Sequence, residues 1–392
     1  LFLRKFAVQA TIPIIIINDF DMNRTLSFTN YRIFAEKQDL SLAPVTVVFG
    51  KNNVGKSALL KLPVLIKNIL DGKNSQGELF DKVSDGLRIC EDYRDVVYGR
   101  GGSKSVDLRI SQDGVTAEIS FFVENAGKPR TKLEHASAIL YDGTTIDSID
   151  QFPSSLNFDI EYLKSIRDYP RDGYFSMTPS ENEQLSGGMF TYRRLVDDFI
   201  NHDGELLQKV SRWYKDTFDD WGIEVDASRD PVFSLMLRHS DLRNNIIDGG
   251  AGIAQSLPVI VSAATEISSP RLYIYEEPET HLHPEAHGEM AEFIAKEAVR
   301  SKGQKSFLIE SHSVNFILRL RTLVAEGKLP DGFLALYYVG FSPEDNRSSA
   351  RKVTVNPDGT VKGWPENVFK ETLEESLALR RAQLKREEAH GE

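Results

Sequence analysis

One stretch of the sequence decides the fold: Gly50-Lys51-Asn52-Asn53-Val54-Gly55-Lys56-Ser57. It follows Val45–Phe49, which reads as a strand, and precedes Ala58–Leu70, whose leucines and isoleucines recur at helical spacing. The two glycines permit a tight turn whose backbone N–H groups face an anion, and the following helix points its positive end at the same place. A strand, this loop and a helix in that order predict a phosphate-binding loop.

The expected ligand of this loop is ATP with Mg²⁺. Lys56 should reach the β- and γ-phosphates, and the Ser57 hydroxyl should ligate the metal. A chance glycine turn is the alternative, but so many fixed positions in the right context rarely arise by accident. The residues of this segment predicted to bind the nucleotide are Gly50, Lys51, Asn52, Asn53, Val54, Gly55, Lys56, Ser57 and Ala58.

Two carboxylates follow a second apolar strand, Leu272–Tyr275. In a sheet next to the phosphate loop, such a strand delivers both acids to the edge where the phosphates lie. Glu276 is predicted to hold Mg²⁺ through water, and Glu277 to orient and polarise the attacking water. An acidic loop after a buried strand is the structural alternative, which the upstream phosphate loop disfavours.

A third strand ends in polar residues at Leu308-Ile309-Glu310-Ser311-His312-Ser313. His312 is predicted to contact the γ-phosphate or the attacking water. A lone histidine is more often structural, but its position one strand after the carboxylates favours the catalytic role. His281 and His283, with Glu279 nearby, suggest a metal site, yet they lie in a loop between prolines without a third strong ligand. A subunit contact is the preferred interpretation.

The pattern along the chain predicts an α/β fold with a mostly parallel core sheet, an antiparallel β-subdomain and a helical insert. The expected divisions are residues 1–150 as the ATPase lobe with the antiparallel β-subdomain, 151–240 as a mainly helical insert, 241–345 as a second ATPase lobe, and 346–392 as a hairpin and helix extension. In the insert, Trp213, Tyr214, Phe218 and Trp221 fit a buried helical stripe better than a base-stacking surface.

Composition narrows the class further. The chain has 392 residues, 41 % of them hydrophobic, which is enough for a full core. Its one cysteine, Cys90, excludes a disulfide framework and a zinc cluster and favours a reducing cytoplasm. The formal net charge of −11 disfavours a surface that grips nucleic acid all over. Leu1–Ile17 is expected to be an extra strand or a disordered extension, with Met22 a possible natural start, and no segment reaches a transmembrane length.

These residues resemble the ABC-type ATPases of the SMC-head, RecF and OLD-like branch. They resemble more closely the bacterial AAA-annotated ATPases that carry a C-terminal domain of unknown function and often occur in anti-phage defence systems. The segments that carry the resemblance are Val47–Ser57 as Walker A, Glu276–Pro284 as Walker B and D-loop, His312 as the switch histidine, Glu161–Pro170 with an arginine before a proline, and Gly363–Phe369 in the C-terminal extension.

The ABC signature has two candidates. Leu185-Ser186-Gly187-Gly188 spells the usual motif but lies too far before the Walker B acids, and is interpreted as a flexible loop. Asp248–Pro258 lies at the expected distance and resembles the branch's own version. The resemblance implies that Gly250, Gly252, Gln255 and Ser256 contact ATP held by a second copy of the chain. Ala254 stands where relatives often have serine, and the Q-loop glutamine has no clear counterpart.

The resemblance implies a head-to-tail homodimer, or a higher homo-oligomer, that sandwiches ATP and opens on hydrolysis. The expected role is the ATP-driven sensor or regulatory subunit of a bacterial anti-phage defence complex whose effector, such as a nuclease, is a separate chain. A RecF-like DNA-repair or chromosome-associated ATPase is an alternative that needs a basic surface. A transporter subunit fits poorly with the long insert, and Ala254 keeps open an ATP-locked scaffold that hydrolyses slowly.

Overall fold

The computed structural model describes residues 24–71, 83–84, 86–101, 104–124, 129–153, 156, 158–175 and 185–365, together with 368, 378, 379 and 381. The expected extension of residues 1–17 and the expected helix of residues 370–388 therefore lie outside the described residues, apart from three isolated positions. Within the described residues, no helix is both long and apolar enough to cross a membrane.

The centre of the fold is a seven-stranded sheet with the order β10-β15-β16-β3-β17-β18-β19. The first five strands run parallel and the last two are antiparallel. Strand β3, which leads into the phosphate loop, pairs with β16 and β17, and its side chains are buried because packed layers cover both faces of the sheet. The strands are β3 Val45–Gly50, β10 Asp159–Leu163, β15 Arg271–Glu276, β16 Lys305–Glu310, β17 Leu334–Ser342, β18 Arg347–Val355 and β19 Val361–Lys362.

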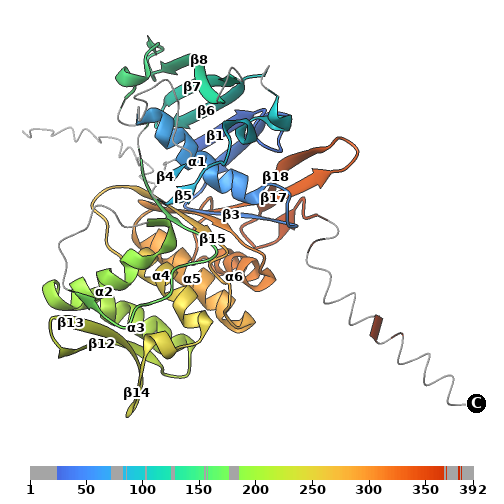
Figure 1. The fold of residues 1–392 in the computed structure, drawn as a ribbon. Helices are drawn as coiled ribbons and strands as arrows, with labels where there is room; N and C mark the ends of the chain where they lie inside the picture. The colour runs from blue at the N-terminus through green and yellow to red at the C-terminus, as the bar shows by residue number, and fades with distance from the viewer. Residues whose placement is uncertain are drawn as a thin grey trace, which may run out of the picture.

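The two faces of this sheet pack against different layers. Because side chains alternate along a strand, Val45, Val47 and Phe49 belong to one hydrophobic core and Val48 to the other. The first core contains the helices α2 to α6, and the second contains α1 and the antiparallel sheet above it (Figure 1). The helices are α1 Lys56–Leu70, α2 Met189–Asn201, α3 Glu205–Thr217, α4 Ala251–Ala264, α5 Pro284–Arg300 and α6 Val314–Ala325.

The predicted antiparallel β-subdomain is confirmed. Its six strands have the order β2-β1-β6-β7-β8-β9. Asp113 and Gly114 both have positive φ in the tight turn between β6 and β7, as the Asp-Gly pair indicates. The strands are β1 Arg24–Thr29, β2 Gln38–Leu42, β6 Val106–Gln112, β7 Val115–Glu124, β8 Arg130–Ile139 and β9 Thr145–Ile146, with a short pair β4 Val83–Ser84 and β5 Leu87–Arg88 nearby in the chain.

The insert is only partly helical. Helices α2 and α3 form as expected, and Trp213 and Tyr214 are buried, with Phe218 and Trp221 packed against the same core. The insert also holds an antiparallel sheet, because the stretch from Gly222 to His239 follows the two-residue period of a strand pair. Its strands are β11 Tyr174–Phe175, β12 Gly222–Arg229, β13 Val232–His239 and β14 Leu242–Asn245.

The segment Leu185–Gly187, expected to be a flexible loop, is a short 3₁₀ helix that leads into α2. Lys164 N–H donates to the Ser186 carbonyl at 3.0 Å, and Asp168 N–H donates to the Gly187 carbonyl at 2.8 Å. A side chain at Gly187 would collide with Asp168. The loop interpretation is therefore wrong, because these backbone contacts hold the segment against the chain that follows β10.

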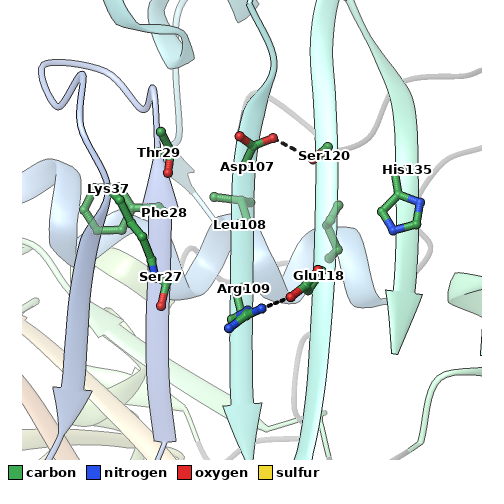
Figure 2. A pocket seen from close by; sticks show the side chains of 11 residues that line it. Ser27, Phe28, Thr29, Lys37, Asp107, Leu108, Arg109, Glu118, Ser120 and His135 are labelled. Atoms are coloured by element: carbon green, nitrogen blue, oxygen red, sulfur yellow. Dashed lines mark hydrogen bonds and ion pairs between the residues drawn. The ribbon is translucent and has the colours of Figure 1, made fainter. Parts of the chain in front are cut away.

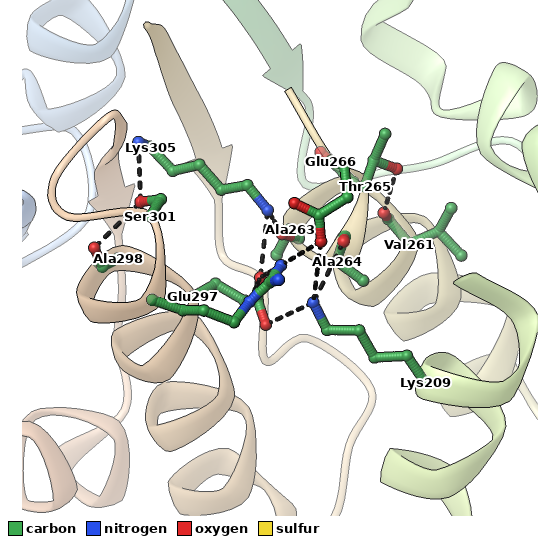
Figure 3. A network of polar contacts seen from close by, with 12 residues as sticks. Lys209, Val261, Ala263, Ala264, Thr265, Glu266, Glu297, Ala298, Ser301 and Lys305 are labelled. Carbon is green, nitrogen blue, oxygen red and sulfur yellow. Dashed lines mark hydrogen bonds and ion pairs between the residues drawn. The ribbon is translucent and has the colours of Figure 1, made fainter. Parts of the chain in front are cut away.

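A buried ion network joins the helical layer to the sheet at the end opposite the phosphate loop (Figure 3). Glu297 on α5 and Lys305 at the start of β16 are only 3 % and 1 % exposed. Their side chains meet at 3.1 Å, and Lys209 from α3 reaches Glu297 at 2.7 Å. Arg300 adds a further contact to Glu297 at 2.7 Å. Such buried charges are tolerable because each has an opposite partner.

Candidate functional site

The site lies where β3, β15 and β16 end. Glu276 at the end of β15 is in register with Glu310 at the end of β16, and Glu310 is in register with Val48 of β3. Because these strands are parallel, the loops that follow them leave the same edge of the sheet. The phosphate loop, the acids after β15 and the Ser311–Ser313 segment are therefore neighbours, as the sequence predicts.

The phosphate loop has the backbone that its glycines permit. Gly50 has φ 151° and Gly55 has φ 99°, and a Cβ at Gly50 would lie 2.2 Å from the Val339 carbonyl oxygen. Helix α1 begins at Lys56 with neither a side-chain cap nor an acidic residue in its first turn, within this described stretch. Its N-terminal N–H groups and dipole are thus left for an anion. This geometry fits a nucleotide phosphate.

Lys56 and Ser57 meet a carboxylate that sequence reasoning did not assign to the site. Glu310 accepts a hydrogen bond from the Ser57 hydroxyl at 2.8 Å, and its other oxygen lies 3.4 Å from the Lys56 ammonium. Lys56 also donates to the Lys51 carbonyl at 2.7 Å. Burial lowers the pKa of Lys56, and the charges of Glu310 and Glu277 oppose that shift.

Glu310 is nearly buried, yet its environment favours the charged form. Burial by itself would raise the pKa of the carboxyl, but His312, the charge of Lys56 and the Ser57 hydroxyl together hold it below the ordinary value. The signal available in the sequence was its position at the end of an apolar strand, the same position that pointed to Glu276.

Glu277 and His312 lie together beside Glu310. The His312 Nε2 atom is 3.9 Å from a Glu277 oxygen and 3.8 Å from a Glu310 oxygen. Both side chains remain reachable from solvent, with Glu277 37 % and His312 34 % exposed. Thr280 donates to the Glu277 carboxylate at 3.1 Å, which fixes its orientation. The structure thus brings Lys56, Ser57, Glu277 and His312 to one place.

Glu277 sits on a strained backbone. Its φ is 43°, a left-handed conformation that costs energy in a residue other than glycine. Its N–H donates to the Glu310 carbonyl at 2.8 Å, which continues the β15–β16 pairing by one residue. Strain of this kind persists only where neighbours hold it, and it places the carboxylate at the mouth of the site.

Glu276 has other partners than the phosphate loop. Its carboxylate accepts a hydrogen bond from the Tyr162 hydroxyl at 2.5 Å and another from the Ser165 N–H at 3.2 Å. Burial, together with the charge of Glu276, raises the pKa of Tyr162 well above its ordinary value, so the phenol remains a donor. A role of Glu276 in holding Mg²⁺ stays a prediction, and the carboxylate in contact with Ser57 is that of Glu310.

Arg167 connects this edge to helix α4. Its guanidinium is 1 % exposed and donates to the carbonyls of Gln255 at 3.0 Å, Glu276 at 2.7 Å and Glu277 at 3.2 Å. The Gln255 side chain in turn binds the Arg167 backbone through both its oxygen and its nitrogen. Burial lowers the pKa of Arg167 to about 10, which leaves it charged at neutral pH.

The expected signature segment forms the start of α4. Gly250 is the N-cap, without a side-chain hydrogen bond, and a Cβ at Gly252 would lie 2.9 Å from the His281 carbonyl oxygen. The Gln255 and Ser256 side chains are buried, and the Ser256 hydroxyl lies 2.6 Å from that of Tyr214. In this conformation only the glycine end of the segment faces solvent, since a helix places these two positions on its inner face.

The loop after β15 is held by internal contacts. Glu279 is buried, accepts from the Ser311 hydroxyl at 2.7 Å and from the His312 N–H at 3.0 Å, and burial raises the pKa of its carboxyl. His283 is the N-cap of α5 and accepts from the Glu285 N–H. Glu279 thus positions the backbone of His312, and His283 has a structural role at the helix start.

The oxygen atoms gathered at this site fit Mg²⁺. Glu277, Glu310 and His312 offer ligand atoms that lie within 4.8 Å of one another. The Ser57 hydroxyl adds an oxygen at the same place, and oxygen is the ligand that Mg²⁺ prefers. A cation there would join the phosphate loop to the ends of β15 and β16.

A separate cavity of about 260 Å³ lies on the antiparallel sheet (Figure 2). Two contacts join neighbouring strands in its wall: the Ser120 hydroxyl donates to Asp107, and Arg109 forms an ion pair with Glu118. These contacts hold β6 against β7, so the polar side chains that line the cavity stabilise the sheet.

A phosphate loop after the central strand of a parallel sheet, flanked by acidic strand ends, defines a P-loop NTPase. Residues 45–319 match the family model described as "AAA domain, putative AbiEii toxin, Type IV TA system". This span covers well over half of the chain, and the chain belongs to that family.

Three solved structures are similar to the chain. The SMC head domain from Thermotoga maritima has 13 % identity and TM-score 0.43, over 84 % of this chain and 98 % of that one. An SmcHead bound to the C-winged helix domain of ScpA has 13 % identity and TM-score 0.49, over 84 % and 98 %. An Smc head domain with an extended coiled coil, bound to the C-terminal domain of ScpA derived from Pyrococcus furiosus, has 11 % identity and TM-score 0.46, over 84 % and 96 %. A search of curated proteins gives no match.

Proposed function

We propose that this chain hydrolyses ATP in a Mg²⁺-dependent reaction at the edge of the sheet formed by β3, β15 and β16. The observation that carries the proposal is the meeting of Lys56 and Ser57 with Glu277 and His312, which come from three separate parts of the chain. Phosphoryl transfer needs positioning and charge stabilisation above all, and these residues supply both.

Each residue has a distinct part in the reaction. Lys56 and the N-terminus of α1 bind the phosphates and neutralise their charge. Glu277 orients the attacking water and accepts its proton, because it is the carboxylate exposed at the mouth of the site. His312 donates to the phosphate or to that water. The bound metal, when present, neutralises charge on the phosphate oxygens.

The catalytic unit in this proposal is a dimer of heads. The N-terminus of α4 at Gly250 has no side-chain cap, and a Cβ built there meets no atom of the described residues within 4 Å. A second copy would present this glycine end to the ATP held by the phosphate loop of the first. Each active site would then be complete only in the assembly.

The proposed biological role is that of an ATP-driven sensor or regulatory subunit in a bacterial anti-phage defence complex. The family description, which names an AbiEii toxin and a type IV TA system, supports a role in which the ATPase switches a harmful effector. The effector, such as a nuclease, would be a separate chain. The formal net charge of −11 favours a protein partner over a DNA-wrapping role.

Phosphate release by the purified chain tests the enzymatic part. Wild type should release phosphate only with Mg²⁺, and Lys56→Met should neither bind nor hydrolyse ATP. Lys328→Met, on an exposed residue remote in sequence from the phosphate loop, serves as the matched control for the removal of one ammonium and should keep wild-type turnover. Absence of turnover by the wild type at every chain concentration would refute the proposal.

Partner capture tests the biological part. The chain should bring down one protein encoded by a neighbouring gene, and the complex should change with ATP in place of ADP. Strong, salt-dependent binding to duplex DNA without a protein partner would instead favour a role in DNA repair.

A further inference from the structure

The proposed function assigns no role to Glu310. It lies at the end of β16, nearly buried, and it contacts the two residues of the phosphate loop that are expected to hold phosphate and metal. It therefore occupies the position where a ligand of both Lys56 and Ser57 would sit. A neutral side chain of similar size would fill the same space, so the buried negative charge at this position requires a functional reason.

The two candidate metal carboxylates differ in what they touch. Glu276 has both oxygens engaged away from the phosphate loop, by the Tyr162 hydroxyl at 2.5 Å and the Ser165 N–H at 3.2 Å. Glu310 has one oxygen on the Ser57 hydroxyl at 2.8 Å. A cation that took Ser57 as a ligand would lie beside this Glu310 oxygen, which already contacts the Ser57 hydroxyl.

We propose that Glu310 is the carboxylate that binds the divalent cation beside Ser57, and that it pairs with Lys56 when no nucleotide is bound. The inference rests on the proposed function, whose metal site it assigns. In the nucleotide-free chain the carboxylate forms an ion pair with the buried Lys56 ammonium at 3.4 Å. ATP must take Lys56 from Glu310, and the cation then provides the positive charge that Glu310 has lost.

This arrangement gives Glu310 two effects of opposite sign. Without a metal, the carboxylate competes with the phosphates for Lys56 and repels them. With a metal, the same carboxylate strengthens the complex. A residue that only supported the fold would weaken nucleotide binding in both conditions, so the two measurements separate a ligand role from a structural one.

The experiment measures binding of a fluorescent ATP analogue to the purified full chain, first in EDTA and then at rising MgCl₂. Glu310→Gln removes the charge and keeps the shape. The variant should bind the metal-free analogue at least as tightly as wild type. The MgCl₂ concentration that gives half of the metal-dependent gain in affinity should rise by about tenfold or more, because removal of a group that supports a metal weakens metal binding by that amount. Glu310→Asp should restore part of the metal effect.

Glu276→Gln is the comparison variant, and thermal melting of each variant checks that it folds. If Glu276→Gln shifts the MgCl₂ requirement and Glu310→Gln does not, the assignment is overturned. Weaker binding of the metal-free analogue by a folded Glu310→Gln also overturns it, because it shows a supporting role. If the wild-type chain binds no analogue with or without MgCl₂, the proposed function fails, and this inference fails with it.

Discussion

Arg167 offers the sharpest test of how the site is held. Arg167→Met keeps most of the volume but removes a charged donor from three carbonyls, those of Gln255, Glu276 and Glu277. At about 1.5–3 kcal/mol for each hydrogen bond from a charged group, the gross loss for the three bonds is about 4.5–9 kcal/mol. Burying the guanidinium costs several kcal/mol that methionine avoids. The expected net loss of unfolding free energy is about 3 kcal/mol.

The same change should reach catalysis through Glu277. This residue has φ 43°, and Arg167 holds its carbonyl. When that contact is lost, the backbone relaxes from a conformation that costs on the order of 1–3 kcal/mol, and the carboxylate moves. A misplacement of about 1 Å lowers turnover by roughly 10²-fold. Nucleotide binding should change much less, since Arg167 does not touch the phosphate loop in any contact that the structure describes.

Urea unfolding and steady-state ATP turnover measure the two effects on the same preparation. Tyr169→Ala, on an exposed side chain two residues away, is the matched control and should change neither. Arg167→Lys keeps the charge but loses the planar guanidinium that reaches several carbonyls at once. It provides a milder variant for both measurements if Arg167→Met is too unstable to fold. An Arg167→Met chain that unfolds at the wild-type urea concentration and turns over ATP at the wild-type rate would refute the reasoning.

Other contacts make further predictions. Glu297→Gln leaves Lys305 buried without its main counter-charge and should cost about 3–5 kcal/mol in urea unfolding. Burial alone would raise the pKa of Glu297, but its cationic partners hold that pKa below the ordinary value. The stabilisation from Glu297 is therefore full above pH ~4.3 and is lost as the pH falls through the lower folded pKa. In a pH series, the unfolding free energies of wild type and variant should converge in acid. Gly55→Ala, at φ 99° with Ile33 2.7 Å from the new Cβ, should abolish ATP binding in a fluorescence titration. Trp364→Ala removes the ring stacked on Phe49 at 5.0 Å and should lower the unfolding free energy by roughly 2 kcal/mol.

The sequence predicted those parts of the molecule that depend on local pattern. The phosphate loop was readable because glycine, lysine and serine at fixed spacing serve one chemistry, and the core strands because their apolar runs are short and bounded. Glu277 and His312 lie beside the loop, as predicted, because parallel strands end at a common edge, whereas the Glu276 carboxylate contacts Tyr162 and Ser165 instead. Each of these predictions needed only the order of elements along the chain.

The parts that were missed depend on contacts between distant segments. Glu310 reads as one more polar residue before His312, and only its contact with Ser57, 253 positions away, shows its place in the site. The burial of Arg167 follows from how α4 packs, which no local pattern reports. The β12–β13 pair was missed because the aromatic residues before Gly222 favoured a helical interpretation of the whole insert, although the alternation that makes the strands was present.

Trp364, near the C-terminal end of the described chain, is a further residue whose role depends on a contact with a distant segment. Trp364 was noted for its resemblance to a family segment, and its role became clear only from the ring of Phe49 beneath it. Phe49 is the last apolar side chain before the phosphate loop, so the C-terminal extension supports the strand that carries the site. A contact between positions 49 and 364 cannot be inferred from either neighbourhood alone.

The most direct test of the central claim combines turnover and mass for wild type and Glu277→Gln. We predict that wild type hydrolyses ATP with Mg²⁺, and that Glu277→Gln binds ATP but does not hydrolyse it. Light scattering should show the variant at twice the monomer mass with ATP and at the monomer mass with ADP. Wild-type turnover by Glu277→Gln, or the same mass with both nucleotides, would contradict the account of a head-to-tail ATPase that uses Glu277.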